Sequence, residues 1–71
     1  MNKLQKQHLG QTIRDIREKQ GVTRAEAARM ARVSQPMWSQ VESGQRVPSL
    51  SMLVQIARGL GVPAARLVRG L

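Results

Sequence analysis

The sequence predicts a small all-α domain of five short helices, and three observations support this fold class. Apolar residues recur every three or four positions, the spacing that gives a helix one apolar face. Polar residues of the kind that cap helix N-termini, Thr23, Ser34 and Ser49, stand before these stretches, and glycines such as Gly21 and Gly61 follow them. No segment shows the strict alternation that is typical of a half-buried strand.

The length and charge of the chain limit the classes of protein that it can belong to. Its 71 residues make one domain at most, and 12 lysines and arginines against 4 acids give a formal net charge of +8. Such a surplus favours a polyanionic partner, either nucleic acid or an anionic membrane surface. A membrane is disfavoured, because no expected helix combines a dense basic face with bulky aromatic residues and no apolar run is long enough to span a bilayer.

The inventory of reactive residues argues against catalysis. Cysteine is absent, His8 is the only histidine and Asp15 is the only aspartate. The chain therefore does not have the residues that a catalytic triad, a multi-histidine metal site or most acid–base pairs require. We expect no enzyme activity, no metal and no cofactor. The lack of cysteine also favours a cytoplasmic protein, because small secreted domains usually depend on disulfides.

The N-terminal residues 1–7 are polar and basic without helical periodicity, and we expect them to form a flexible arm. Residues 8–71 are expected to form the folded domain. Its first helix has Leu9, Ile13 and Ile16 on one face. This helix should end near Gly21, because glycine readily adopts the left-handed conformation that closes a helix.

The second and third helices are expected to lie between about residues 23 and 43. Thr23 and Glu26 form a capping-box pattern at the start of the second helix. Ser34 is placed to cap the third helix, with Pro36 in the first turn, where a missing N–H is tolerated, and Gly44 ends it. Two short helices separated by about three residues are the layout of a helix-turn-helix, whose second helix enters the DNA major groove.

The last two helices complete the predicted domain. The fourth begins after Ser49, has a wide apolar face and stops at Gly61. A short fifth helix opens at Pro63. It carries apolar residues that are available for contact with a second copy of the chain. These possible dimer contacts are Leu67, Val68 and Leu71.

The third helix divides its residues between an inner and an outer face. Trp38 and Val41 are three positions apart and share a face, so we expect both in the core. The outer faces are polar and contain no acid before Glu42, which lets the helix approach a polyanion. Glutamine can bond adenine bidentately, and methionine can pack against the thymine methyl group. The predicted base-reading residues are Gln35, Met37, Ser39 and Gln40.

From Thr23 onward, the segment TRAEAARMARVSQPMWSQVESGQRVPS resembles the helix-turn-helix of the phage-repressor/Cro family, also called the Xre family. The flanking residues fit as well, so the resemblance covers nearly the whole chain. It implies a compact five-helix fold of the lambda-repressor type. It places Ala28 where the second and third helices cross, and Trp38 and Val41 at buried positions. It also implies an ion pair between Arg17 and Glu42 that joins the first helix to the end of the third.

Phosphate contacts are expected where the second and third helices begin and beyond the third helix. A cation in the first turn of a helix opposes the helix dipole, which favours a phosphate beside Arg24. The resemblance supports the candidates at the start of the second helix and those beyond the third helix. The candidates are Thr23, Arg24, Ser34, Gln45, Arg46 and Ser49. Arg32 departs from the family, which usually has glycine in the turn, so either a non-glycine residue adopts a positive φ there or the turn is recast.

The resemblance implies a transcriptional regulator of prokaryotic or phage type, with repression as the expected role and the nucleoid as its place. We expect a homodimer that occupies a two-fold-related operator in double-stranded DNA through the major groove. Two alternatives stay open. One is an antitoxin of the same fold, with a toxin as its protein partner and DNA binding that serves its own regulation. The other is a non-specific nucleic-acid binder that depends on charge alone.

Overall fold

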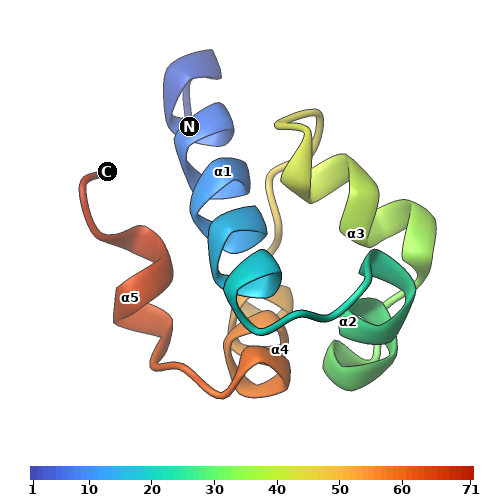
Figure 1. Ribbon diagram of the computed structural model, residues 1–71. Helices are drawn as coiled ribbons and strands as arrows, with labels where there is room; N and C mark the ends of the chain where they lie inside the picture. Colours follow the sequence, from blue (N-terminus) through green and yellow to red (C-terminus); the bar gives the residue numbers. More distant parts are fainter.

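The computed structural model describes residues 1–71 and contains five α-helices and no strands (Figure 1). In chain order the helices are α1 (Lys3–Lys19), α2 (Arg24–Ala31), α3 (Gln35–Glu42), α4 (Leu50–Leu60) and α5 (Ala64–Val68). The predicted all-α, five-helix fold class is therefore confirmed. None of the helices has the length and hydropathy that a membrane span requires.

The start of α1 differs from the prediction, because the expected flexible arm over residues 1–7 is helical from Lys3 onward. Asn2 caps the helix: its side chain accepts a hydrogen bond from the Gln5 backbone N–H at 2.8 Å, and the Gln5 side chain accepts one from the Asn2 N–H at 3.1 Å. Gln5 Nε2 also donates to the carbonyl of Leu71 at 3.3 Å. The beginning of α1 is thus bound to the end of the chain.

The polar caps indicated by the sequence lie at the starts of their helices. Thr23, Ser34 and Ser49 each accept a hydrogen bond from the backbone N–H of the third helical residue. In the turn between α2 and α3, Arg32 adopts the left-handed conformation with φ of 59°. Of the two expected alternatives for this turn, a non-glycine residue with positive φ is therefore the one observed.

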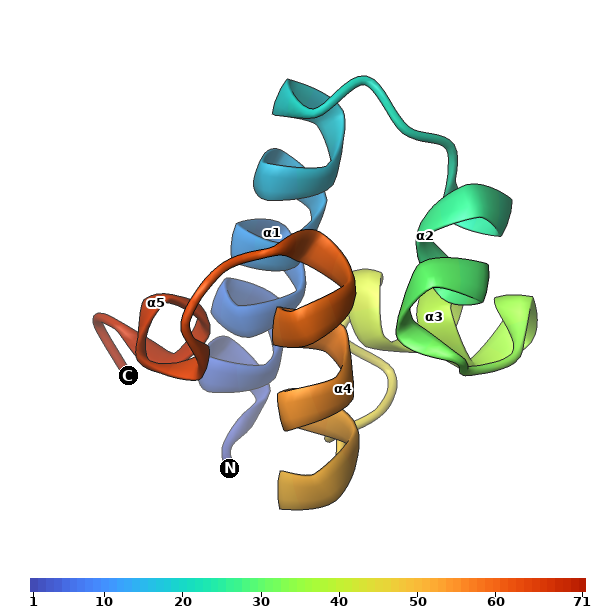
Figure 2. The same cartoon turned by 90° about the horizontal axis from the view of Figure 1, so that it is seen from below.

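The core lies between the five helices, and α2 and α3 lie on one side of α1 while α5 lies on the other (Figures 1 and 2). All five helices contribute to its 12 buried apolar residues, and Trp38 is the largest of the fully buried side chains. Ala28 and Val41 belong to the same buried cluster. Because α3 and α5 lie on opposite sides of α1, a contact made through α5 leaves the outer face of α3 accessible.

Two glycines let pairs of helices approach closely. A Cβ atom at Gly10 would lie 2.5 Å from the carbonyl oxygens of both Val41 and Glu42, so α1 crosses the end of α3 in direct backbone contact. A Cβ atom at Gly59 would lie 2.8 Å from the backbone nitrogen of Ala31, where α4 crosses α2. Packing therefore requires glycine itself at position 59, although glycine weakens a helix interior.

The structure corrects one expectation about the dimer surface. Leu67, which the sequence offers as a possible dimer contact, has 0% of its surface exposed and belongs to the core. Val68 and Leu71 remain exposed, at 40% and 38%. A helix of five residues is too short for its apolar spacing to show which side faces the core.

Candidate nucleic-acid interface

The outer face of α3 presents the residues that are expected to read bases. Gln35 and Gln40 are exposed, and Met37 and Ser39 are half-buried. The opposite side of the helix is anchored by Trp38, which is 1% exposed. Figure 1 shows α3 at an edge of the molecule, on the side away from α5. A polar face without a charged group is therefore accessible over most of this helix.

Glu42, the last residue of α3, is buried and accepts hydrogen bonds from three helices. Its side chain is only 1% exposed. Arg17 of α1 binds the carboxylate bidentately, with Nε 2.6 Å from Oε2 and Nη2 3.1 Å from Oε1. Trp38, one turn earlier in α3, donates its indole N–H to Oε2. Arg24, the first residue of α2, donates from Nε to Oε1 at 3.2 Å. One carboxylate thus joins the end of α3 to α1 and α2.

The hydrogen bonds keep this buried cluster charged. Burial raises the pKa of the Glu42 carboxylate, but the hydrogen bonds from Arg17, Trp38 and Arg24 lower it by more, so its pKa lies below the ordinary value of 4.5. The hydrogen bond to Glu42 in turn raises the pKa of the Arg17 guanidinium. Two guanidinium groups face one carboxylate, and the cluster therefore has a net positive charge next to the start of α2.

The sequence does not predict two of the contacts in this cluster. The sequence predicts only a core role for Trp38, yet its indole N–H has a charged partner. The spacing of four between Trp38 and Glu42 on one helix is the signal that points to this bond. For Arg24 the sequence predicts a phosphate, whereas the structure provides a protein partner, Glu42, which also offsets the unfavourable position of a cation at a helix N-terminus.

Three of the expected phosphate-contacting residues are helix caps with exposed side chains. The hydroxyl oxygens of Thr23, Ser34 and Ser49 accept backbone hydrogen bonds at 3.1 to 3.2 Å. A hydroxyl that accepts one hydrogen bond keeps its own proton for donation. Each cap can therefore hold its helix and donate to a phosphate oxygen at the same time.

Besides Arg24 and the three caps, two expected phosphate-contacting residues lie in the loop after α3. Gln45 and Arg46 are exposed, and their backbone N–H groups donate to the carbonyl of Gln40 at 2.9 and 3.2 Å. These bonds hold the loop directly beside Gln40, which is one of the predicted base-reading residues. The structure thus brings candidate phosphate and base contacts together at the end of α3.

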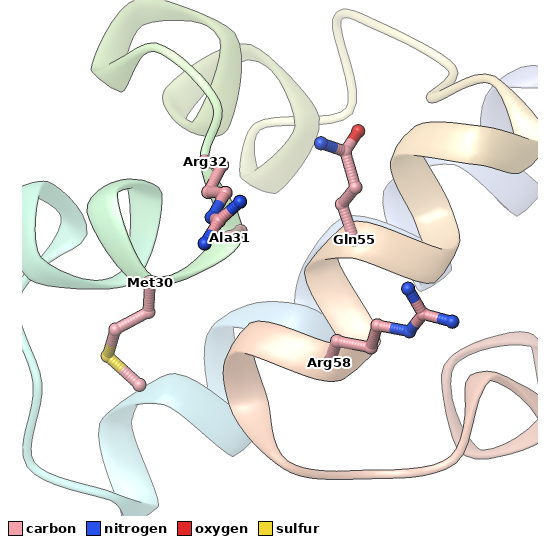
Figure 3. A pocket seen from close by; sticks show the side chains of 5 residues that line it. All are labelled: Met30, Ala31, Arg32, Gln55 and Arg58. Carbon is pink, nitrogen blue, oxygen red and sulfur yellow. The ribbon is translucent and has the colours of Figure 1, made fainter.

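A hollow of about 430 Å³ lies between α2 and α4, away from these residues. Figure 3 shows its lining residues: Met30, Ala31, Arg32, Gln55 and Arg58. Neither arginine forms an ion pair. The lining comes from the end of α2 and the C-terminal half of α4, where the helix dipoles disfavour an anion, so we assign no ligand to it. The structure also gathers no group of three or more histidine, aspartate or glutamate side chains that could hold a metal ion.

We expect the stability of the domain to fall in acid because of Glu42. The pKa of this carboxylate is lower in the folded chain than in the unfolded one, so the folded state binds fewer protons. Its stabilising contribution is complete above the ordinary value of 4.5 and is lost as the pH falls through the folded value. Urea unfolding followed by Trp38 fluorescence should therefore show a falling midpoint below about pH 4.5.

A Glu42→Gln variant is the control for this pH dependence. It removes the titrating group at nearly constant size, and the fall in acid should become shallower. The stability of the variant should still fall somewhat in acid because of Glu26, whose pKa is also lowered by the hydrogen bonds of its capping box with Thr23. An equally steep fall in the variant would show that Glu42 does not contribute.

Known proteins resemble this chain in sequence and in fold. A family model described as a helix-turn-helix domain matches residues 8–69. Among solved structures, the restriction-modification controller protein C.AhdI from Aeromonas hydrophila is 26% identical, with 87% of this chain and 94% of that chain aligned and a TM-score of 0.86. The clp gene regulator ClgR from Corynebacterium glutamicum is 31% identical, with coverages of 94% and 87% and a TM-score of 0.85.

A third solved structure places the same fold inside a longer protein. A transcriptional regulator of the HTH_3 family from Vibrio cholerae is 25% identical, with a TM-score of 0.86. The alignment covers 90% of this chain and 36% of that one. No curated protein sequence gives a significant match.

Proposed function

We propose that this chain, which belongs to the family of helix-turn-helix domains, binds double-stranded DNA at a specific sequence and thereby represses transcription. Its fold is that of transcriptional regulators. The observation that supports the proposal best is the division of α3: its outer face is polar and accessible, while Trp38 and Glu42 fix its inner face to the rest of the domain. A helix held in this way can enter a major groove without a change of fold.

Base recognition in this proposal depends on α3. Gln35 and Gln40 present amide groups that can bond adenine bidentately, and Met37 can contact a thymine methyl group. Ser39 can donate to or accept from several bases and contributes less to selectivity. Because none of these side chains is charged, they can distinguish between sequences but add little to the affinity for DNA in general.

Affinity for any DNA would then come from the phosphate contacts and the positive charge. The exposed residues proposed for this role are Thr23, Arg24, Ser34, Gln45, Arg46 and Ser49. They flank α3 in sequence, at the starts of α2, α3 and α4 and in the loop after α3. Phosphate contacts set the position of a protein on the duplex, and a net charge of +8 raises its rate of association.

We further propose that the chain acts as a homodimer on a two-fold-related operator. Val68 and Leu71 are exposed apolar residues at the C-terminal end, and Leu4, at 76% exposure, adjoins the Gln5 side chain that binds the Leu71 carbonyl. Helix α5, which carries Val68, lies on the side of the molecule away from α3 (Figure 1). One protomer measures 28 by 22 by 22 Å between Cα atoms, so half-sites one helical turn apart, about 34 Å, leave room for one protomer on each.

Paired alanine variants test the two kinds of contact. Gln40→Ala should weaken binding to the cognate site by about 1–3 kcal/mol and leave binding to random duplex nearly unchanged. Arg46→Ala should weaken binding to both and reduce the slope of log K against log salt by about one. Fluorescence anisotropy with labelled duplexes at several salt concentrations measures both effects.

The pattern of losses decides the outcome of this experiment. Equal weakening of both duplexes by Gln40→Ala would contradict base reading by α3. An unchanged salt slope for Arg46→Ala would remove that residue from the phosphate contacts. Equal affinity of the wild-type chain for every duplex would leave only non-specific electrostatic binding.

A further inference from the structure

We infer that Glu42 positions Arg24 for contact with a DNA phosphate, so that the end of α3 and the start of α2 bind the DNA backbone as one unit. The inference rests on the proposed DNA-binding function and assigns Glu42 a part in it beyond holding α3 to α1. Glu42 itself is buried and does not touch DNA in this arrangement. It acts through Arg24.

The two ends of the Arg24 side chain lie in different environments. Its Nε donates to Oε1 of Glu42 at 3.2 Å, and that carboxylate is 1% exposed. The Arg24 side chain as a whole is 45% exposed, and it makes no other side-chain hydrogen bond. A guanidinium group has five N–H donors in a planar fork, so four remain on the two terminal nitrogens. Those are donors that can bind two oxygens of one phosphate.

Glu42 does not neutralise the positive charge of Arg24. Arg17 already binds both carboxylate oxygens, at 2.6 and 3.1 Å, and Trp38 donates to one of them. One guanidinium therefore balances the carboxylate, and the second leaves a net positive charge at the surface. Because Nε is held, Arg24 also has less side-chain freedom to lose on binding than a free arginine.

The position of Arg24 in the helix favours the same ligand. It is the first residue of the eight-residue helix α2 and follows the cap Thr23. The partial positive charge of a helix N-terminus favours an anion there. A phosphate bound by the free end of Arg24 would lie in this field, and Glu42, on the buried side of Arg24, stabilises the cation while no DNA is present.

A double-mutant cycle on Glu42 and Arg24 tests the inference, with a random-sequence duplex as the probe because phosphate contacts are independent of sequence. Charge alone predicts that Glu42→Gln tightens binding, since it removes a negative charge. If Glu42 positions Arg24, Glu42→Gln should do the opposite and weaken binding by roughly three- to tenfold. The slope of log K against log salt should fall by up to about 0.9, the contribution of one phosphate contact. In an Arg24→Ala background, Glu42→Gln should cause no further loss.

Two results would overturn the inference while the proposed function stands. One is tighter or unchanged binding by Glu42→Gln. The other is an equal loss in both backgrounds, which would mean that α3 is only loosened. A wild-type chain that shows no salt-dependent binding to any duplex would instead overturn the proposed function, and the inference with it.

A charge-preserving pair of variants keeps the test decisive if Glu42→Gln fails to fold. A single lysine ammonium at position 24 cannot bind Glu42 and also donate two hydrogen bonds to a phosphate. Arg24→Lys should therefore lose several-fold in affinity for the random duplex. Arg14→Lys is the matched control, because Arg14 is also 45% exposed and pairs through Nε with a carboxylate, that of Glu18. It should bind like the wild type. Wild-type affinity for Arg24→Lys would overturn the inference.

Discussion

Replacement of Arg17 by alanine is expected to lower the free energy of unfolding by about 3 kcal/mol, because it leaves the buried carboxylate of Glu42 without its bidentate partner. Arg24 and Trp38 still bond the carboxylate, which keeps the loss from being larger. The Arg17 Nη1 bond to the Val22 carbonyl, 2.9 Å, is lost as well. A domain of this size is stable by only roughly 4–11 kcal/mol, so the variant should lose about a quarter to three quarters of its stability.

Arg14→Ala is the matched control for this measurement. Arg14 lies on the same helix and pairs with Glu18 at 3.5 Å, but both side chains are about half exposed. Exposed pairs of this kind contribute roughly 0–1 kcal/mol. Urea unfolding of the two variants, followed by Trp38 fluorescence, should separate them clearly. Equal stability of the two would mean that the buried cluster does not hold α3 to α1.

Gly10→Ala is expected to destabilise the domain, although alanine is the better helix former. Helix propensity alone predicts a gain of about 1 kcal/mol. The added Cβ, however, would lie 2.5 Å from the carbonyl oxygens of Val41 and Glu42, and backbone atoms at a helix crossing cannot move aside as a flexible side chain does. We expect a net loss of about 1–3 kcal/mol.

Gln11→Ala, at the next residue along α1, is the control for an alanine at an exposed position of this helix, where only an exposed hydrogen bond from Gln11 Nε2 to Asp15 is lost. It should change stability by no more than about 0.5 kcal/mol. Thermal unfolding followed by circular dichroism compares the two variants. Because Gly10 touches the end of α3, its variant should also weaken DNA binding more than Gln11→Ala does. A gain in stability for Gly10→Ala would contradict the close crossing of α1 and α3.

Local signals in the sequence were enough to predict most of the fold. The caps Thr23, Ser34 and Ser49 and the stop at Gly61 set helix ends through contacts within a few residues, so α2 to α4 could be placed without tertiary information. The apolar spacing does not predict the start of α1, because residues 1–7 have no apolar periodicity. The cap Asn2, with Gln5 three residues later, was a local signal of the same kind as the predicted capping box at the start of α2.

The rest of the candidate site depends on contacts between distant residues. Arg24 and Glu42 are 18 positions apart, and only the crossing of α2 and α3 brings them together. The burial of Leu67 likewise depends on how α5 packs, which a five-residue helix does not reveal from its own spacing. Only the family resemblance predicts the pair of Arg17 and Glu42, because nothing in the spacing of those two residues requires it.

Sequence-specific binding by α3 is the central claim, and selection of bound duplexes from a random pool by the wild-type chain tests it most directly. The account predicts one enriched motif with two-fold symmetry and half-sites about one helical turn apart, bound at least ~10³-fold more tightly than random duplex. A pool that shows no enriched motif, with equal affinity for every duplex, would contradict it.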